Sequence, residues 1–150
     1  MIKIVEGNLL DATEDIIGHQ VNCKGVMGSG VAKQLNEKYS NLFYEYKGYL
    51  SIDKSSTLGS CQFVRVGNSN KIVANIFGQD GYGYGKQFTD LKALISGLVE
   101  LKEFAVTNKC SVVLPYKIGS DRGGANWNEV YKIIENVFSD YEVILYRWEP

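Results

Sequence analysis

The stretch NCKGVMGSGVAKQL, residues 22–35, combines closely spaced glycines with the start of a helical pattern. Backbone N–H groups in such a turn, together with a helix N-terminus, form a concave site for an anion. The stretch matches neither common nucleotide fingerprint: its glycines follow the order G-x-x-G-x-G, and Val31 stands where a P-loop has lysine. The alternative is that these glycines only close a tight turn.

His19 lies just before this stretch and is the only histidine of the chain. Because the ordinary pKa of imidazole is near neutral pH, His19 is suited to proton transfer. The alternative is a structural histidine whose ring is hydrogen-bonded inside the fold. No Cys/His cluster in the sequence has zinc spacing, so we expect neither a metal ion nor a cofactor.

The apolar patterns predict a scaffold of alternating strands and helices. Short β-branched runs predict strands that begin at Ile2, Ile16, Cys61, Lys71, Ser111 and Glu142. Helices are expected at residues 31–39, at residues 42–50, after a Thr89 cap and after an Asn126 cap. Parallel strands need crossovers that cover the sheet, so this order predicts one α/β domain over residues 1–150 with a central mixed sheet.

Ligands of such folds bind beyond the carboxyl ends of the strands, and polar or glycine-rich stretches of this chain follow several strands. They are GNLLD after the first strand, NCKGVMGSG after the second, GQDGYGYGK after the run KIVANIF and YKIGSDRGGAN after the run SVVLP. We therefore expect these loops to line one cleft, which favours ligand binding over a plain turn.

Three of these motifs resemble, in the same order, motifs of the macrodomain family, whose members bind ADP-ribose. EGNLL resembles the family's G-[DN]-[IL] motif, VNCKGVMGSGVA its N-x-x-G-x-x-G-x-G-[IV]-A segment, and LPYKIGSDRGGANW its second glycine loop. The likeness runs over essentially the whole chain. It implies a three-layer α/β/α macrodomain whose partner is ADP-ribose or an ADP-ribose derivative.

The resemblance also implies where the ligand would lie. The two glycine loops would flank the diphosphate and donate backbone N–H groups from opposite sides, which small residues permit. The binding residues implied in this way are Asn8, Leu9, Val26, Met27, Gly28, Ser29, Gly30, Val31, Ile118, Gly119, Ser120, Asp121, Arg122, Gly123 and Gly124.

Some of these side chains have a second interpretation. Asn8 matches a family position beside the adenine amine, but an Asx turn would use the same amide. Asn22 matches the asparagine directed at the distal ribose. We expect the Asp121 carboxylate to point away from a diphosphate, because the two charges repel. Arg122 is either a source of positive charge or a solvated surface residue.

Macrodomains read ADP-ribose, remove it from protein or nucleic acid, or dephosphorylate ADP-ribose 1″-phosphate. The segment GHQVNCKG resembles the phosphatase-like branch, in which a histidine precedes an Asn-Cys pair. By this likeness His19, Asn22 and Asp80 would be catalytic, with His19 transferring a proton and Asp80 positioning water or acting as the base; Asp121 competes for that role. We expect the phosphatase; the alternatives are an ADP-ribosyl hydrolase acting on protein or nucleic acid and a non-catalytic reader.

An ester-hydrolysing branch of the family places a catalytic lysine shortly after the strand that corresponds to KIVANIF, where this chain has GQD. Lys86 comes several residues too late, so lysine-dependent covalent catalysis is disfavoured. The tyrosines and glycines of GQDGYGYGKQF form either a lid over the distal ribose or a plain solvent loop.

Composition restricts the partners further. The 16 basic and 17 acidic residues give a net charge of −1 without a basic block, so indiscriminate attraction to nucleic acid or membranes is not expected. Three separated cysteines, Cys23, Cys61 and Cys110, fit a reducing compartment better than a disulfide framework. No secretory signal and no apolar run near the ~20 residues of a membrane span is present, so we expect a cytoplasmic protein without a membrane partner.

Overall fold

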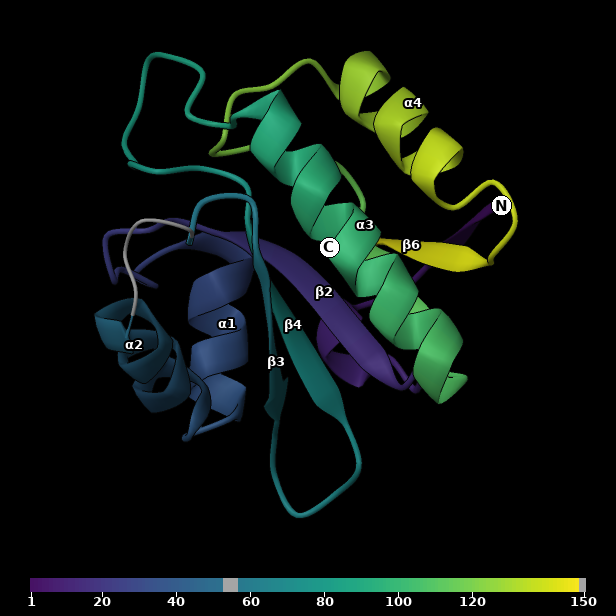
Figure 1. The fold of residues 1–150 in the computed structure, drawn as a ribbon, viewed down its shortest axis with the longest axis horizontal. Coiled ribbons are helices and arrows are strands. Elements are labelled where there is room, and N and C mark those ends of the chain that lie inside the picture. Colours follow the sequence, from purple (N-terminus) through teal and green to yellow (C-terminus); the bar gives the residue numbers. More distant parts are fainter. Residues whose placement is uncertain (53–56, 149–150) are drawn as a thin grey trace.

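The computed structural model describes residues 1–52 and 57–148, which form a six-stranded sheet between pairs of helices (Figure 1). The strands are β1 (Ile2–Glu6), β2 (Ile16–Val21), β3 (Cys61–Arg65), β4 (Ile72–Phe77), β5 (Val112–Pro115) and β6 (Val143–Arg147). The helices are α1 (Gly30–Lys38), α2 (Leu42–Ile52), α3 (Leu91–Asn108) and α4 (Trp127–Val137), with a 3-10 turn, η1 (Leu9–Asp11). The predicted three-layer α/β/α fold is confirmed.

The sheet has the strand order β1-β6-β5-β2-β4-β3 and is mixed, as expected. All neighbouring pairs are parallel except β3, which runs antiparallel to β4. Strand β2 therefore lies between β4 and β5 with the same direction as both. The carboxyl ends of these three strands meet at one edge, and the loops that leave them are brought together there.

Both faces of the sheet are buried (Figure 1). Helices α1 and α2 cover one face, and α3 and α4 cover the other. Adjacent residues on β2 alternate between these faces: Ile16 packs in the cluster under α3 and α4, and Ile17 packs in the cluster under α1 and α2. Each such fully buried aliphatic side chain contributes about 1.5–3 kcal/mol through the hydrophobic effect. The packing of both faces makes β2 a rigid base for its loop.

The caps of α3 and α4 differ in how well the sequence predicts them. Asn126 caps α4 as expected, accepting a hydrogen bond from the Glu129 amide at 3.3 Å. The expected Thr89 cap of α3 is wrong, because Asp90 takes that position and accepts from the Ala93 amide at 3.1 Å. The Thr89 hydroxyl instead donates to the carbonyl of Gly119 at 2.7 Å. Thr89 thus joins two loops rather than starting a helix.

Candidate functional site

A cleft of about 360 Å³ lies at the carboxyl ends of β2, β4 and β5. It is bordered by the first glycine loop (residues 22–30), the second glycine loop (residues 115–124) and the tyrosine loop (residues 79–88). This size is in the range of small-molecule sites. The predicted residues that border it are His19, Asn22, Val26, Met27, Gly28, Ser29, Gly30, Val31, Ile118, Gly119, Asp121, Arg122 and Gly123.

Other predicted residues lie outside the lining of the cleft. Asn8 caps η1, its Oδ1 atom accepting from the Leu10 amide at 3.0 Å, which is the Asx-turn alternative. Leu9 is buried in the core under α1 and α2. Ser120 does not border the cleft, and Gly124 borders a neighbouring hollow instead. The ligand roles of these residues stay predictions.

The first glycine loop is folded around the side chain of Asn22. The Asn22 Nδ2 atom donates to the Val26 carbonyl at 2.8 Å, and its Oδ1 atom accepts from the Lys24 amide at 2.9 Å. The hydroxyl of Tyr46, from α2, lies 2.9 Å from the same Oδ1 and 2.6 Å from the Asn22 carbonyl. Burial raises the pKa of Tyr46 to about 12, so this hydroxyl stays a donor. Asn22 therefore shapes the loop, and its expected contact with a ribose stays a prediction.

The first glycine loop leaves open space beside its backbone. Gly30 begins α1 at φ +61°, a conformation that favours glycine, and a Cβ there would meet no atom within 4 Å. At Gly28 a Cβ would meet only the Val26 Cγ1 atom, at 3.8 Å. Ser29 caps α1 without a side-chain hydrogen bond to it. The start of α1, residues 30–32, thus borders the cleft beside open space, and a helix N-terminus suits an anion.

The second glycine loop is packed tightly against its neighbours. At Gly123 a Cβ would lie 2.1 Å from the Thr89 Oγ1 atom and 2.6 Å from the Gly119 carbonyl, so only glycine fits. Its carbonyl accepts from the amides of Phe88 and Thr89 at 2.8 and 3.0 Å. The tyrosine loop is thereby tied to the second glycine loop before α3 begins.

Gln20 strengthens this connection from the end of β2. Its Nε2 atom donates to Gln79 Oε1 at 2.7 Å and to Thr89 Oγ1 at 2.8 Å. Its Oε1 atom is buried and has no hydrogen-bond partner among the described residues. Gln20 and Gln79 both border the cleft but were not predicted, because an amide in a strand or a loop carries no signal of its partners.

His19 is buried on β2 and borders the cleft. Its Nε2 atom lies 2.6 Å from Asn75 Oδ1, and the Asn75 Nδ2 atom donates to Gln62 Oε1 at 3.0 Å. This orientation of the Asn75 amide assigns the ring proton to Nε2 and leaves Nδ1 as an acceptor. Nδ1 has no partner within the part of the chain that the structure describes.

Burial determines the charge of this imidazole. Desolvation lowers the pKa of His19 to about 4, although the hydrogen bond with Asn75 opposes the shift. At neutral pH the ring is therefore uncharged. His19 has a lone pair at Nδ1 and no imidazolium proton to give, so of the two proton-transfer roles only that of base is open to it, and a pKa of about 4 makes it a weak base.

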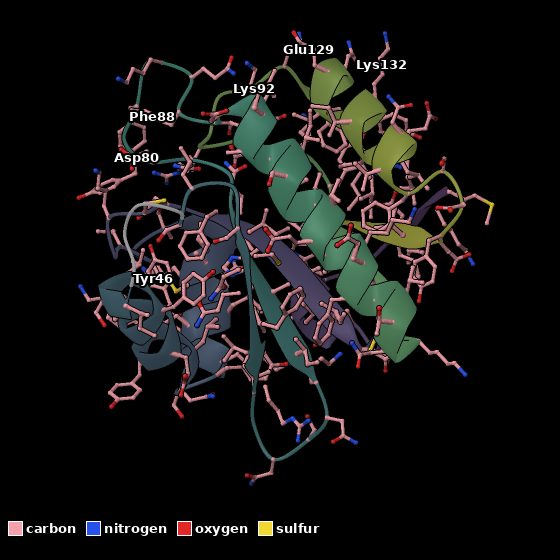
Figure 2. All side chains as sticks on the ribbon, in the orientation of Figure 1. Tyr46, Asp80, Phe88, Lys92, Glu129 and Lys132 are labelled. Carbon is pink, nitrogen blue, oxygen red and sulfur yellow. The ribbon has the colours of Figure 1, made fainter. Side chains whose placement is uncertain are left out.

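Asp80 lies outside the lining of the cleft, on the first part of the tyrosine loop (Figure 2). Its carboxylate pairs with Lys24 at 3.1 Å, and its side chain is 61% exposed. Its carbonyl accepts from the Cys23 amide at 2.9 Å. Asp80 thus ties the first glycine loop to the tyrosine loop. The carboxylate of Asp80 does not line the cleft, and its expected role as a catalytic base stays a prediction.

A model of the macro domain family matches residues 19–134, from His19 into α4. The chain belongs to the macro domain family. Across the whole chain, this macrodomain is 28% identical to an uncharacterized 17.5 kDa protein of Enterobacteria phage T4, covering 98% of that protein.

One further relative and one solved structure come from Mycobacterium tuberculosis. The DNA ADP-ribosyl glycohydrolase of Mycobacterium tuberculosis is 26% identical to this macrodomain over 97% of the chain. The chain spans only 42% of the length of that glycohydrolase. The solved macrodomain of Mycobacterium tuberculosis DarG superposes with a TM-score of 0.84 at 26% identity, covering 97% of each chain.

Four residues of the loops that were expected to line the cleft border it, although none of them was named as a site residue. Tyr82 and Tyr84 reach it from the tyrosine loop, whose composition is that of a lid or a solvent loop. Tyr116 and Lys117 border it before the second glycines, and Lys117 adopts φ +69°, which is uncommon outside glycine. Asp121, expected to turn away, is an exposed residue of the cleft wall.

The cysteines of this macrodomain are free thiols. Burial and the neighbouring Asp80 raise the pKa of Cys23 to about 11, and burial also raises the pKa values of Cys61 and Cys110. None is an activated thiolate at neutral pH. Within residues 1–52 and 57–148, no group of His, Cys, Asp and Glu is arranged to hold a metal, and no helix has the length and hydropathy of a membrane span.

Proposed function

We propose that this macrodomain binds ADP-ribose in the cleft and hydrolyses ADP-ribose derivatives that carry a group on the distal ribose. The observation that carries the proposal is the meeting of two glycine loops across one cleft, with Gly28 to Gly30 on one side and Ile118 to Gly123 on the other. Backbone N–H groups from the start of α1 would hold the diphosphate without a metal ion.

The reacting end of the ligand would lie near the neutral ring of His19. A base that removes a proton from an attacking water needs a free lone pair, and Nδ1 of His19 has one. The Asn75 amide holds the ring in this tautomer from the other side. A neutral acceptor nitrogen on a ring that borders the cleft supports a hydrolytic reaction.

The group removed distinguishes two candidate reactions. We favour the removal of ADP-ribose from DNA, because the similarity to DNA ADP-ribosyl glycohydrolases extends over almost the whole chain. The exposed tyrosines of the tyrosine loop also favour this reaction. Release of phosphate from ADP-ribose 1″-phosphate is placed second. It is supported by His19 in the GHQVNCKG segment, but its expected second residue, Asp80, is paired with Lys24 outside the cleft.

One set of incubations tests both reactions. The purified chain is mixed separately with an ADP-ribosylated single-stranded oligonucleotide, an ADP-ribosylated protein and ADP-ribose 1″-phosphate, and released ADP-ribose and phosphate are measured. We expect ADP-ribose from the oligonucleotide. Phosphate alone would select the phosphatase, and tight binding of ADP-ribose by calorimetry without any product would leave a reader. The absence of ADP-ribose binding at millimolar concentration would refute the proposed function.

A further inference from the structure

A side hollow adjoins the cleft where the tyrosine loop meets the second glycine loop. It is bordered by residues 83–87 and by residues 121, 122 and 124. Gly83, Tyr84, Asp121 and Arg122 border both the hollow and the cleft. A molecule that fills the cleft can therefore extend past this shared wall into the hollow.

The shared wall is made by a stacked pair. The Arg122 guanidinium lies over the ring of Tyr84, with 4.9 Å between its central carbon and the ring centroid, and an Arg122 nitrogen donates to the Tyr84 hydroxyl. Arg122 holds one side of the ring, yet 80% of Tyr84 remains exposed. Tyr82 is also exposed. Aromatic residues this exposed contribute little to the core, and the pair presents a flat surface to a ligand.

The charges around the hollow favour a phosphate-containing partner. Lys86 lies over the Phe88 ring at 4.9 Å, on the outer part of the loop where Figure 2 labels Phe88. Neither Lys86 nor Arg122 forms an ion pair in the described part of the chain. Asp121 is the acidic residue of the wall. Two cations without carboxylate partners beside an exposed aromatic ring are the elements of a site for single-stranded nucleic acid.

We propose that the side hollow is a nucleobase subsite, so that ADP-ribose attached to single-stranded nucleic acid fills the cleft and the hollow together. A base of the strand would stack on the Tyr84–Arg122 pair, and Lys86 would lie near a backbone phosphate. A duplex buries both faces of its bases and cannot stack in this way. The balanced net charge of the chain makes such local contacts necessary, because no basic face attracts nucleic acid at long range.

The proposal rests on the proposed function and adds the subsite that would hold the nucleic-acid part of the substrate. It is tested with the full chain by comparing the dissociation constants of free ADP-ribose, an ADP-ribosylated single-stranded oligonucleotide and an ADP-ribosylated peptide, in the wild type and in Tyr84→Ala, Tyr84→Phe and Tyr44→Ala. Tyr44 on α2 is 79% exposed and is the matched control. Hydrolysis during binding is avoided by short mixing times at low temperature.

We expect the oligonucleotide to bind more tightly than ADP-ribose, and Tyr84→Ala to reduce this advantage about 5- to 100-fold, as for the loss of one base–aromatic stack. Tyr84→Phe and Tyr44→Ala should keep the full affinity advantage of the oligonucleotide.

Lys86→Gln, which alters the hollow but not the cleft lining, should make oligonucleotide binding less sensitive to salt. Retention of the full advantage in Tyr84→Ala, or an equal advantage for the peptide, would overturn the proposal. Failure of the proposed function is a different result, in which ADP-ribose itself does not bind.

Discussion

The two glycine loops that face each other across the cleft differ in the space around their backbones. A Cβ at Gly28 or Gly30 of the first loop meets open space or one distant methyl group. A Cβ at Gly123 of the second loop meets Thr89 and a carbonyl at distances that no side chain tolerates. Gly28 and Gly30 therefore leave room for a ligand, whereas Gly123 is required by the close packing of its own loop.

The loops also differ in what holds them. The first is held by the buried side chain of Asn22, which the Tyr46 hydroxyl from α2 clamps, and by the contacts that Cys23 and Lys24 make with Asp80. The second is held by a network from β2 and the tyrosine loop, in which Gln20 and Thr89 are the central members. The two glycine-rich loops thus serve different purposes, and substitutions in them are expected to separate ligand binding from folding.

The largest effect is expected beneath both loops, at His19. If its Nδ1 atom accepts a proton from water, His19→Ala should lower turnover by about 10²–10⁴-fold while ADP-ribose affinity changes little. Product release and calorimetry on the same sample measure the two quantities. A matched fall in both would instead indicate that β2 and its loop were damaged. Full turnover by a folded variant would remove His19 from the mechanism.

The pH dependence of folding tests the burial of the same ring. The pKa of His19 is about 4 in the folded chain and ordinarily 6.5, so between these values the unfolded chain binds the extra proton. Stability should therefore fall by about 3 kcal/mol as the pH is lowered from 7 to 4, since one pKa unit corresponds to about 1.4 kcal/mol. Urea titrations at several pH values measure this slope. It should be reduced in His19→Gln, and an unchanged slope would contradict a neutral buried ring.

Gly28→Glu tests whether the first glycine loop holds the diphosphate. The side chain has room in the free protein but adds bulk and negative charge where a diphosphate would lie, so ADP-ribose affinity should fall about 100-fold. The midpoint of urea unfolding should stay close to that of the wild type. Gly28→Ala is the control and should bind nearly normally. Unchanged binding by Gly28→Glu would show that this loop does not hold phosphate.

Gly123→Ala tests the close packing of the second glycine loop. Unlike Gly28→Glu, it should lower the stability of the fold. One methyl group in contact with Thr89 and the Gly119 carbonyl should destabilise the fold by about 1–3 kcal/mol, as expected for overpacking. Denaturant unfolding gives the number, with Gly28→Ala as the partner measurement. If Gly123→Ala proved as stable as Gly28→Ala, the contrast between the loops would not hold.

The smallest effect is expected from Tyr46→Phe, which removes the clamp on Asn22 but keeps the ring stacked on Phe77. Loss of this buried hydroxyl should reduce stability by about 1–2 kcal/mol and weaken ADP-ribose binding severalfold through a looser first loop. Unfolding and calorimetry measure the two changes. Thr89→Val, which loosens the second loop in a similar way, gives the comparison.

Much of the fold was predictable because it depends on local pattern. The β-branched runs marked β1 to β6, and the apolar spacing of the later helices marked α3 and α4 within a few residues. The two glycine loops were predictable for the same reason, since glycine spacing and an adjacent helix start are local features. His19 could be singled out because it is the only histidine.

The amino-acid sequence by itself determined the order of the elements, the layered fold and the two glycine loops, because periodicity and glycine spacing act over a few residues. Only the tertiary structure decided that Asp80 pairs with Lys24, that Gln20 bonds to Gln79 and Thr89, and that Arg122 stacks on Tyr84. The members of these contacts lie as many as 69 residues apart in the chain. They meet because parallel strands bring their carboxyl ends to one edge of the sheet. The type of a polar residue does not indicate which residue it will contact at that edge.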